Sequence, residues 1–347
     1  MVNHNDLKKY FKNQNILVTG GTGSIGQCIV SSLLNYEPKK LIIFSKDDSN
    51  QYLMKQKYMH HPNVFFHLGD IREYEAVEYI TRGIDMVFHV AALKQVPVCE
   101  EHPFEAIKTN VMGSENVIKS CILNKVKKVV NISTDKAVNP SNTMGATKLL
   151  SEKLFLNANT KLNNDQTQFC SVRFGNVLNS RGSVIPLFLK QAQSGESLTV
   201  TESSMTRFIM TITEAAELTL KSAYYANGGE TFIFKMKSLN ILMLAEAIRT
   251  FYKDKGKSLP SVKQIGKRAG EKLYEELIYA HEFERVVEDP ELYVILPDSV
   301  DSFLHFKRNT APKFRSDQVE LLQESDIISI LTVIDEEGRG DTGATKN

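Results

Sequence analysis

Short apolar runs that alternate with helix-like segments constrain the fold of this chain more than any other feature. The runs are continuous and rich in Val, Ile and Phe, which is typical of strands buried on both faces of a parallel sheet. They occupy residues 15–20, 40–45, 64–70, 85–92, 126–133 and 168–175, with helix-compatible segments between them. Five or six strand–helix repeats predict an α/β fold with a Rossmann-type doubly wound parallel sheet.

The alternation weakens after residue 176, which predicts a smaller C-terminal lobe interleaved with the last elements of the sheet. We expect residues 1–176 and about 206–236 to form the sheet domain, since 230–235 is a further apolar run. Residues from about 177–205 and 237–330 are expected to form the smaller lobe. The polar, Gly-rich residues 331–347 are expected to be disordered.

Composition narrows the classes of partner. The chain has 347 residues, with 42 Lys and Arg against 41 Asp and Glu, so charge indicates neither nucleic acid nor a membrane surface. No signal peptide and no transmembrane helix are expected, because no apolar run is long enough. The four cysteines, Cys28, Cys99, Cys121 and Cys170, form no C-x-x-C pair, which predicts free thiols in a cytoplasmic protein and no metal site.

A glycine-rich loop joins the first predicted strand to the first predicted helix. Gly20, Gly23 and Gly26 form G-x-x-G-x-x-G, which permits a tight turn and close approach of the backbone to a pyrophosphate. The helix N-terminus adds free N–H groups that favour phosphate. We predict a dinucleotide site that also includes Thr22, Ser24 and Ile25, the alternative being an ordinary strand–helix turn.

The end of the second strand bears on which dinucleotide is bound. Ser45 and Lys46 come first after the apolar run and suit a ribose 2′-phosphate, which favours NADP. Asp47 and Asp48 follow and keep NAD open, and Lys46 has the alternative of being a solvated surface charge. Asp70 and Ile71 end the third strand, where the adenine edge is expected.

Three chemically active residues follow the fifth strand. Thr134, Asp135 and Lys136 lie at the carboxyl end of a central strand, where ligands bind in open parallel sheets. A hydroxyl, a carboxylate and an amine can orient a substrate hydroxyl, supply an acid and supply a base. The alternative is an Asp–Lys pair that only caps the strand end.

The stretch SNTMGATK at residues 141–148 raises a chemical problem. In a large class of nicotinamide enzymes this spacing holds a tyrosine base and a lysine that binds the cofactor ribose. Lys148 is present, but Met144 stands where the tyrosine is expected, and a thioether cannot accept a proton. Either the chain is not an enzyme, or another residue takes the proton.

Taken in order, several motifs resemble the UDP-N-acetylglucosamine 4,6-dehydratases, extended short-chain dehydrogenase/reductases of bacterial polysaccharide and glycan biosynthesis. The motifs are TGGTGSIG, HVAALKQVPVCEEHPFEAIKTN, STDKAVNPSNTMGATK, RFGNVLNSRGSVIPLF, MTRF and GKRAGEKLYEEL, between about residues 12 and 300. The resemblance implies a lyase with a tightly bound, recycled NADP, the substrate UDP-N-acetylglucosamine and a homo-oligomer, either a dimer or a hexamer.

The implied reaction gives a UDP-2-acetamido-2,6-dideoxy-4-keto-hexose in three stages. Hydride leaves sugar C4 for the nicotinamide, water is eliminated across C5 and C6, and hydride returns to C6. Thr134 would bond the C4 oxygen, Asp135 would protonate the departing C6 hydroxyl, and Lys136 would take the C5 proton. Lys148 would hold the nicotinamide ribose. Met144 fills the tyrosine's space, and our hypothesis is that Asp135 accepts the C4 proton, directly or through a water held by Thr134.

Matching positions extend the implied site. The cofactor would also contact Ala91, Ala92, Lys94 and Asn110. The UDP-sugar would be bound by Lys94, Asn176, Arg181, Ser183, Arg207, Arg268 and Glu271. Arginine suits a diphosphate because its guanidinium donates two hydrogen bonds in one plane.

Three alternatives to a configuration-retaining dehydratase stay open. An inverting dehydratase would also epimerise C5, and NPSNTMGATK looks closer to the retaining forms. A UDP-sugar 4-epimerase would use the same cofactor but would be expected to keep the tyrosine. A non-enzymatic NADP sensor predicts loss of the surrounding residues, yet Thr134, Asp135, Lys136 and Lys148 are all present.

Overall fold

The computed structural model describes residues 2–180, 182–256, 258–268 and 270–342, which divide into two compact units. Unit 1 contains the residues up to Phe174 together with Ile212–Lys235 and Leu277–Pro312. Unit 2 contains Gly175–Thr211, Met236–Glu276 and the residues from Lys313 onward. The chain therefore passes between the units several times.

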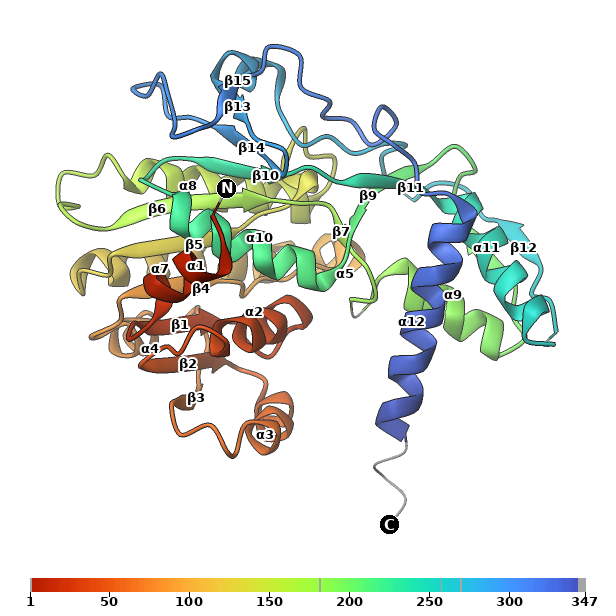
Figure 1. Cartoon of the computed structure of the whole chain (residues 1–347), viewed down its shortest axis with the longest axis horizontal. Helices are drawn as coiled ribbons and strands as arrows, with labels where there is room; N and C mark the ends of the chain where they lie inside the picture. The colour runs from red at the N-terminus through yellow and green to blue at the C-terminus, as the bar shows by residue number, and fades with distance from the viewer. Residues whose placement is uncertain (1, 181, 257, 269, 343–347) are drawn as a thin grey trace. The chain divides into compact units, whose positions relative to one another are not determined.

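The described residues of unit 1 build a ten-stranded sheet (Figure 1). Seven neighbouring strands are parallel, in the order β3-β2-β1-β4-β5-β6-β10. Their bounds are β1 Asn15–Thr19, β2 Lys40–Ser45, β3 Val64–Leu68, β4 Met86–His89, β5 Lys128–Ile132, β6 Gln168–Arg173 and β10 Thr231–Phe234. Each coincides with one of the apolar runs, which confirms the predicted doubly wound Rossmann-type sheet.

The register of the central strands explains why these runs are apolar. Leu17, Val87, Val129 and Phe169 lie opposite one another across β1, β4, β5 and β6, and all four are fully buried in one core cluster. Phe155 of α8 packs in the same cluster. Since helices cover both faces of such a sheet, every position of a central strand has to be apolar or internally paired.

The helices of unit 1 pack in two groups. One contains α4 Tyr74–Ile80, α7 Gly113–Leu123 and α8 Thr143–Ala158, and the other contains α1 His4–Phe11, α2 Ser24–Leu34 and α10 Ile212–Tyr225. The remaining helical elements of unit 1 are α3 Asp48–Lys57, α5 Val96–Glu101, α6 Pro103–Ile107, the π-helix Lys108–Met112 and the 3-10 helices Asp135–Ala137 and Ala280–Arg285.

The expected domain boundaries need correction at two places. Residues 277–312 were expected in the smaller lobe, but they belong to unit 1, where β14 Leu292–Ile295 pairs antiparallel with β10. β13 Val286–Glu288 and β15 Lys307–Arg308 continue that sheet. These strands cover the edge of β10, which would otherwise leave its backbone N–H and C=O groups unpaired. Conversely, β9 Thr206–Met210, expected in the sheet domain, belongs to unit 2.

Unit 2 is built from two small sheets and three helices among its described residues. One sheet has the order β11-β9-β7, with β11 Lys237–Asn240 and β7 Asn176–Val177, and the other pairs β12 Val262–Gln264 with β8 Leu198–Val200. The helices are α9 Val184–Gln193, α11 Ile241–Asp254 and α12 Glu324–Thr342.

The prediction of a disordered tail is wrong as far as Thr342. α12 continues through that part of the chain and packs against α11 (Figure 1). Ile327 and Leu331 are one helical turn apart and buried, so the apolar stripe that anchors the helix begins before the polar residues do. Residues 343–347, the rest of the predicted tail, lie outside the described residues.

None of the described helices combines the length and the apolar character needed to cross a membrane.

Candidate active site

The glycine loop lies where β1 ends and α2 begins. Gly20 has a φ of +65°, and a Cβ at this position would lie 2.7 Å from the backbone of Ala91. A Cβ at Gly26 would lie 2.4 Å from the Gly20 carbonyl oxygen. The loop therefore needs glycine to bring the start of α2 close to the strand end, and Gly23 caps that helix. This cradle fits a pyrophosphate bound at a helix N-terminus.

Thr22 ties the loop to the end of β2. Its hydroxyl lies 2.8 Å from the Ser45 hydroxyl, and both residues are buried. Ser24 and Ile25 form the first turn of α2. Six of the expected cofactor contacts thus lie together in the glycine loop and the first turn of α2, namely Gly20, Thr22, Gly23, Ser24, Ile25 and Gly26.

The two residues after β2 have different roles, since Lys46 is a surface cation and Asp47 is the N-cap of α3. Lys46 is exposed, and its Nζ lies 3.6 Å from Asp70 Oδ2. Asp47 caps α3, because its Oδ1 accepts the backbone N–H of Asn50 at 2.9 Å. The nearest carboxylate after the strand is therefore engaged in its own helix.

Asp70 lies in a charged cluster at the end of β3. Arg72 Nε donates to its Oδ2 at 2.8 Å, and Arg72 Nη1 donates to Glu105 Oε2 at 2.7 Å. Burial acts to raise the pKa of Asp70, but the bonds from Arg72 and the nearby charge of Lys46 hold that pKa below its usual value. The Ile71 side chain packs in the core, and its contact with the adenine edge stays a prediction.

The loop after β4 is held by Asn110. The Asn110 amide donates to the Leu93 carbonyl at 2.9 Å and accepts the Leu93 N–H at 2.8 Å. It also donates to the Thr147 hydroxyl of α8 at 3.0 Å. Asn110 lies in the π-helix, which turns its side chain towards this loop. The structure therefore places it as a support of the loop that contains Ala91, Ala92 and the exposed Lys94.

Thr134, Asp135 and Lys136 form a compact acid–base group after β5. The Thr134 hydroxyl donates to Asp135 Oδ1 at 2.9 Å, and Lys136 Nζ donates to the same oxygen at 3.0 Å. Asp135 is fully buried. Its Oδ2 has no hydrogen-bond partner among the residues that the structure describes. A buried carboxylate oxygen of this kind is a ready acceptor for a ligand hydroxyl, since buried polar atoms normally have a partner.

Met144 occupies an apolar pocket in the first turn of α8. It is buried and packs with Cys99 and Ala106, with Leu93 and Val96 at the edge of the cluster. Burial raises the pKa of the Cys99 thiol, so this cluster contains no ionised nucleophile. Position 144 therefore contributes packing and no proton-accepting group.

Lys148 is buried one turn further along α8. Burial lowers its pKa to about 8, although the Glu152 carboxylate acts in the opposite direction. His89, in β4, is a core residue, because its Nδ1 lies 2.8 Å from the Thr19 hydroxyl and burial lowers its pKa to about 3. Lys148 is thus a titratable group whose charge can change near neutral pH.

A buried ionic network behind the acid–base group was missed from the sequence. Arg173 is fully buried and donates to Glu152 Oε2 at 2.9 Å and to Glu282 Oε2 at 2.7 Å. Burial acts to lower the pKa of Arg173, but the two carboxylates raise it, so the guanidinium stays charged. The sequence contained one indication of this network, because Arg173 lies inside the apolar run 168–175. A charged side chain in a buried strand requires partners of opposite charge.

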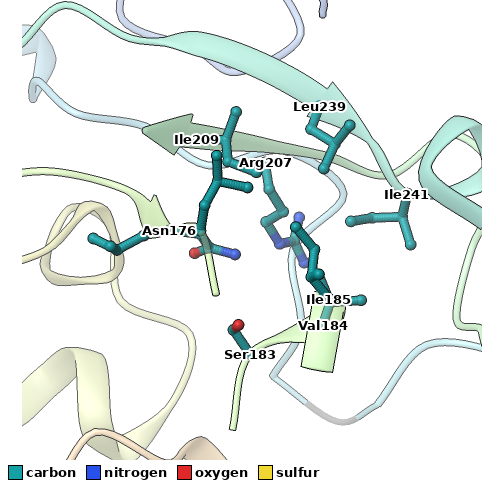
Figure 2. Close-up of a pocket in the computed structure, with 10 residues that line it drawn as sticks. Asn176, Ser183, Val184, Ile185, Arg207, Ile209, Leu239 and Ile241 are labelled. Atoms are coloured by element: carbon teal, nitrogen blue, oxygen red, sulfur yellow. The ribbon is translucent and has the colours of Figure 1, made fainter. Parts of the chain in front are cut away.

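Unit 2 gathers some of the expected substrate residues around a small pocket. Asn176, Ser183 and Arg207 line it, together with apolar residues of β7, α9, β9 and β11 (Figure 2). Arg207 is buried and donates through Nη1 to the Thr206 carbonyl at 2.8 Å. The Ser183 hydroxyl has no partner among the described residues, although Ser183 is the N-cap of α9. A guanidinium, an amide and a helix N-terminus together suit an anionic group.

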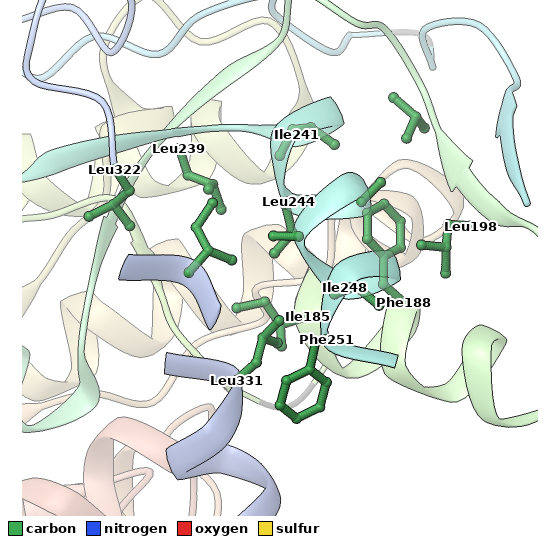
Figure 3. Packing of buried hydrophobic residues seen from close by; sticks show 14 of the residues in the cluster. Ile185, Phe188, Leu198, Leu239, Ile241, Leu244, Ile248, Phe251, Leu322 and Leu331 are labelled. Carbon is green, nitrogen blue, oxygen red and sulfur yellow. The ribbon is translucent and has the colours of Figure 1, made fainter. Parts of the chain in front are cut away.

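The pocket has a rigid apolar floor. Ile185, Leu239 and Ile241 belong both to its lining and to the core cluster of unit 2 (Figure 3). Leu244 and Leu331 pack in the same cluster, so α11 and α12 support the pocket from behind. The polar residues of the pocket therefore project from a well-packed base.

The remaining substrate residues are more scattered. Glu271 lies 3.5 Å from Arg207 Nη2, so it belongs beside the pocket. Arg268 is exposed and does not line the pocket, although its backbone N–H is bonded to Glu271. Arg181 lies outside the described residues. Among the described residues, no cluster of His, Cys, Asp and Glu is suited to a metal ion.

Comparison with known proteins identifies the family. A family model described as polysaccharide biosynthesis protein matches residues 16–297. The chain belongs to that family. Among relatives of the chain, an uncharacterized membrane protein of Methanocaldococcus jannaschii is 43% identical over 332 residues, covering 95% of this chain and 98% of its own. A UDP-glucose 4-epimerase of Rickettsia bellii is 42% identical over 296 residues, covering 84% and 85%.

Solved structures agree with this placement. The X-ray structure of Pen from Bacillus thuringiensis has a TM-score of 0.87 and 41% identity, covering 93% of this chain and 98% of that one. A UDP-N-acetylglucosamine 4-epimerase from Methanobrevibacter ruminantium M1 has a TM-score of 0.64 and 27% identity, covering 75% and 87%. The chain is thus an extended short-chain dehydrogenase/reductase related to nucleotide-sugar epimerases.

Proposed function

We propose that this protein is a UDP-N-acetylglucosamine 4,6-dehydratase that retains the configuration at C5. One observation carries the proposal. Asp135 is buried with Oδ2 unpartnered among the described residues, while Lys136 and Thr134 both contact its Oδ1. Dehydration needs an acid and a base side by side, whereas hydride transfer at C4 needs only one proton acceptor.

The cofactor proposed is NADP, tightly bound and recycled. When bound, it would supply the hydride acceptor at C4 and the hydride donor at C6. The loop from Gly20 to Gly26 would hold its pyrophosphate, Ser45 and Lys46 its 2′-phosphate, and Lys148 its nicotinamide ribose. NADP is favoured over NAD because Asp47 caps α3 and the exposed cation Lys46 is left at the strand end.

The first proton transfer is assigned to Asp135. Its Oδ2 accepts the proton of the C4 hydroxyl as that carbon is oxidised, while Thr134 orients the C4 oxygen. Met144 takes no part, because its thioether is packed against Cys99 and Ala106. Asp135 is then protonated and ready to act as an acid.

The elimination uses both members of the pair. The C4 ketone acidifies the C5 proton, so a side-chain amine can remove it. Lys136 first releases its own proton to solvent and then takes the C5 proton. Asp135 donates its proton to the C6 hydroxyl, the C6–O bond breaks, water leaves, and Asp135 is again ionised.

The configuration at C5 is retained if the same group removes the C5 proton and later returns a proton to C5. Lys136 removes the C5 proton, returns a proton to the same face when C6 is reduced, and then takes up a proton from solvent to regenerate its ammonium group. In the inverting alternative, a second group would deliver the proton from the opposite face. The sequence similarity of NPSNTMGATK to retaining forms and the position of Lys136 beside Asp135 support retention.

The UDP part of the substrate is assigned to unit 2. Asn176, Ser183 and Arg207 line its pocket, and Glu271 lies beside Arg207. We propose that this pocket binds the diphosphate and uridine. The roles of Arg181, Arg268 and Lys94 in binding the same substrate stay predictions from the family resemblance, as do a cytoplasmic location and a dimeric or hexameric assembly.

A UDP-sugar 4-epimerase is the second candidate. The observation in its favour is the name UDP-glucose 4-epimerase carried by a Rickettsia bellii relative at 42% identity. Such an enzyme would oxidise and reduce C4 and would leave the C5 and C6 positions untouched. The Asp135–Lys136 pair would then have no evident use beyond C4.

Incubation with UDP-N-acetylglucosamine in deuterated water separates these candidates. A dehydratase gives a product lighter by one water that carries deuterium at C5, because the ammonium group of Lys136 exchanges with solvent. NMR of that product then gives the C5 configuration. A product with the mass of the substrate and no deuterium at C5 would identify the epimerase and sink the dehydratase proposal.

A further inference from the structure

A side chain distant in sequence holds the far end of the turn that carries Asp135 and Lys136. The Tyr279 hydroxyl donates a 2.6 Å hydrogen bond to the carbonyl oxygen of Ala137, which lies 142 positions earlier. Ala137 ends the 3-10 helix Asp135–Ala137. Because this element is a single turn, a bond at its end limits how far Asp135 and Lys136 can move.

Tyr279 is itself fixed by the buried Arg173. The guanidinium lies 5.4 Å from the centre of the Tyr279 ring. Arg173 Nη1 also donates to the Leu277 carbonyl at 3.1 Å and to Glu282 Oε2 at 2.7 Å. The Tyr279 N–H donates to that same carboxylate at 2.9 Å. The backbone on both sides of Tyr279 is therefore anchored to one buried cation.

Arg173 also anchors the helix that carries Lys148. Its Nε donates to Glu152 Oε2 at 2.9 Å, and its Nη2 donates to the other oxygen of that carboxylate. Glu152 lies one helical turn after Lys148 in α8. Arg173 thus connects α8 to the segment of Tyr279, and Tyr279 connects that segment to the acid–base turn.

We propose that Tyr279 is a positioning residue that keeps Asp135 and Lys136 in the arrangement required for water elimination. This inference rests on the proposed dehydratase function. C4 oxidation needs one proton acceptor, whereas elimination needs an acceptor at C5 and a donor at C6 in the same geometry. Loosening the turn therefore slows elimination more than it slows C4 oxidation.

Tyr279→Phe tests the proposal, because it removes the hydroxyl and keeps the ring over Arg173. Tyr10→Phe is the matched control, since the Tyr10 hydroxyl also donates to a backbone carbonyl of unit 1, that of Ala223, at 2.9 Å. Two measurements are made on each full-length variant. One is the deuterium uptake of the backbone amides around Ala137. The other compares, with UDP-N-acetylglucosamine, the rate of dehydrated product with the rate at which reduced-nicotinamide absorbance appears.

In Tyr279→Phe we expect faster deuterium uptake around Ala137. The ratio of elimination to C4 oxidation should fall by about three- to tenfold, the effect of one neutral hydrogen bond on an equilibrium. Tyr10→Phe should change neither quantity. If Tyr279→Phe does not fold, Tyr279→Leu, which also lacks a donor to the Ala137 carbonyl, replaces it.

Unchanged uptake around Ala137, or equal slowing of both steps, would overturn the positioning role. A wild-type protein that forms no dehydrated product contradicts the proposed function instead. In that case the deuterium uptake alone decides whether Tyr279 holds the turn.

Discussion

The ammonium group of Lys136 lies 3.0 Å from Oδ1 of the buried carboxylate of Asp135. With Asp135 ionised and Lys136 protonated, the pair holds one proton. When Asp135 accepts the proton of the C4 hydroxyl, the pair holds two protons. The proposed elimination needs Asp135 protonated and Lys136 neutral, which is one proton. Lys136 therefore has to release its proton to solvent before it can remove the proton from C5.

Asp135→Asn is predicted to abolish even the first hydride transfer, because an amide does not accept the C4 proton. The rate at which reduced-nicotinamide absorbance appears with UDP-N-acetylglucosamine should fall by about a hundredfold or more. Asp85→Asn is the control, since Asp85 is a partly buried aspartate that is likewise paired with a lysine, Lys127, at 2.9 Å. If Asp135→Asn reduces its cofactor at the normal rate, Lys136 becomes the first candidate for the base.

Met144→Leu is predicted to keep the turnover within about threefold of wild type, because volume-conserving apolar substitutions are well tolerated in cores. Met144→Tyr places a larger ring against Cys99 and Ala106 and should lower the free energy of unfolding by about 1–3 kcal/mol. Turnover assays and urea unfolding check both variants. A loss of turnover in Met144→Leu comparable to that of Asp135→Asn would assign chemistry to position 144.

Lys148 should make stability depend on pH. Its pKa is about 8 in the folded chain, against an ordinary value of 10.5, so between these pH values the unfolded chain binds the extra proton. The free energy of unfolding of wild type should therefore rise with pH in that window, relative to Lys148→Met, by up to about 1.4 kcal/mol per pH unit. Below about pH 8 the difference between the two proteins should be constant, with the buried charge at its full cost.

Urea unfolding of wild type and Lys148→Met at several pH values across this window measures the effect. Lys153→Met is the control, because Lys153 is an exposed residue of the same helix. A difference between wild type and Lys148→Met that does not change with pH would mean that Lys148 keeps an ordinary pKa.

Lys46→Ala is predicted to weaken binding of NADPH by about tenfold and to leave NADH binding unchanged, since a charge-assisted bond to phosphate is lost only with NADPH. Fluorescence titration with the two nucleotides measures this. Lys55→Ala, at an exposed position of α3, should change neither affinity. Equal weakening of both nucleotides would contradict a 2′-phosphate contact at Lys46.

Arg207→Lys is predicted to weaken UDP binding by about tenfold, because an ammonium group cannot donate two parallel bonds to a diphosphate. Calorimetric titration with UDP measures the affinity. The control is Arg249→Lys on α11, where the partly buried arginine pairs with Glu246 at 2.8 Å. Unchanged UDP binding by Arg207→Lys would remove the unit 2 pocket from the proposed site.

The strands of the central sheet and the glycine loop could be predicted from the sequence, because each depends on residues close together in the chain. β1, β2, β4, β5 and β6 are runs whose own burial makes them apolar, as Leu17 and Val129 illustrate, whereas β3 at the sheet edge exposes Phe65 and Leu68. Gly20 and Gly26 serve one turn, and the acid–base group Thr134, Asp135 and Lys136 is contiguous. Local steric and hydrophobic constraints act on such segments wherever they lie in the fold.

Only the tertiary structure determined which side chains contact and support the acid–base group Thr134, Asp135 and Lys136. The sequence shows that an apolar residue needs burial and that a buried charged residue needs a partner. It does not show which residue the partner is. Arg173 pairs with Glu152 and Glu282, and Tyr279 bonds to Ala137 across 142 residues. These contacts form because β6, β10 and β14 are neighbours in one sheet and α8 packs against β6. The same global packing brought Leu277–Pro312 into unit 1 and ordered α12 as far as Thr342.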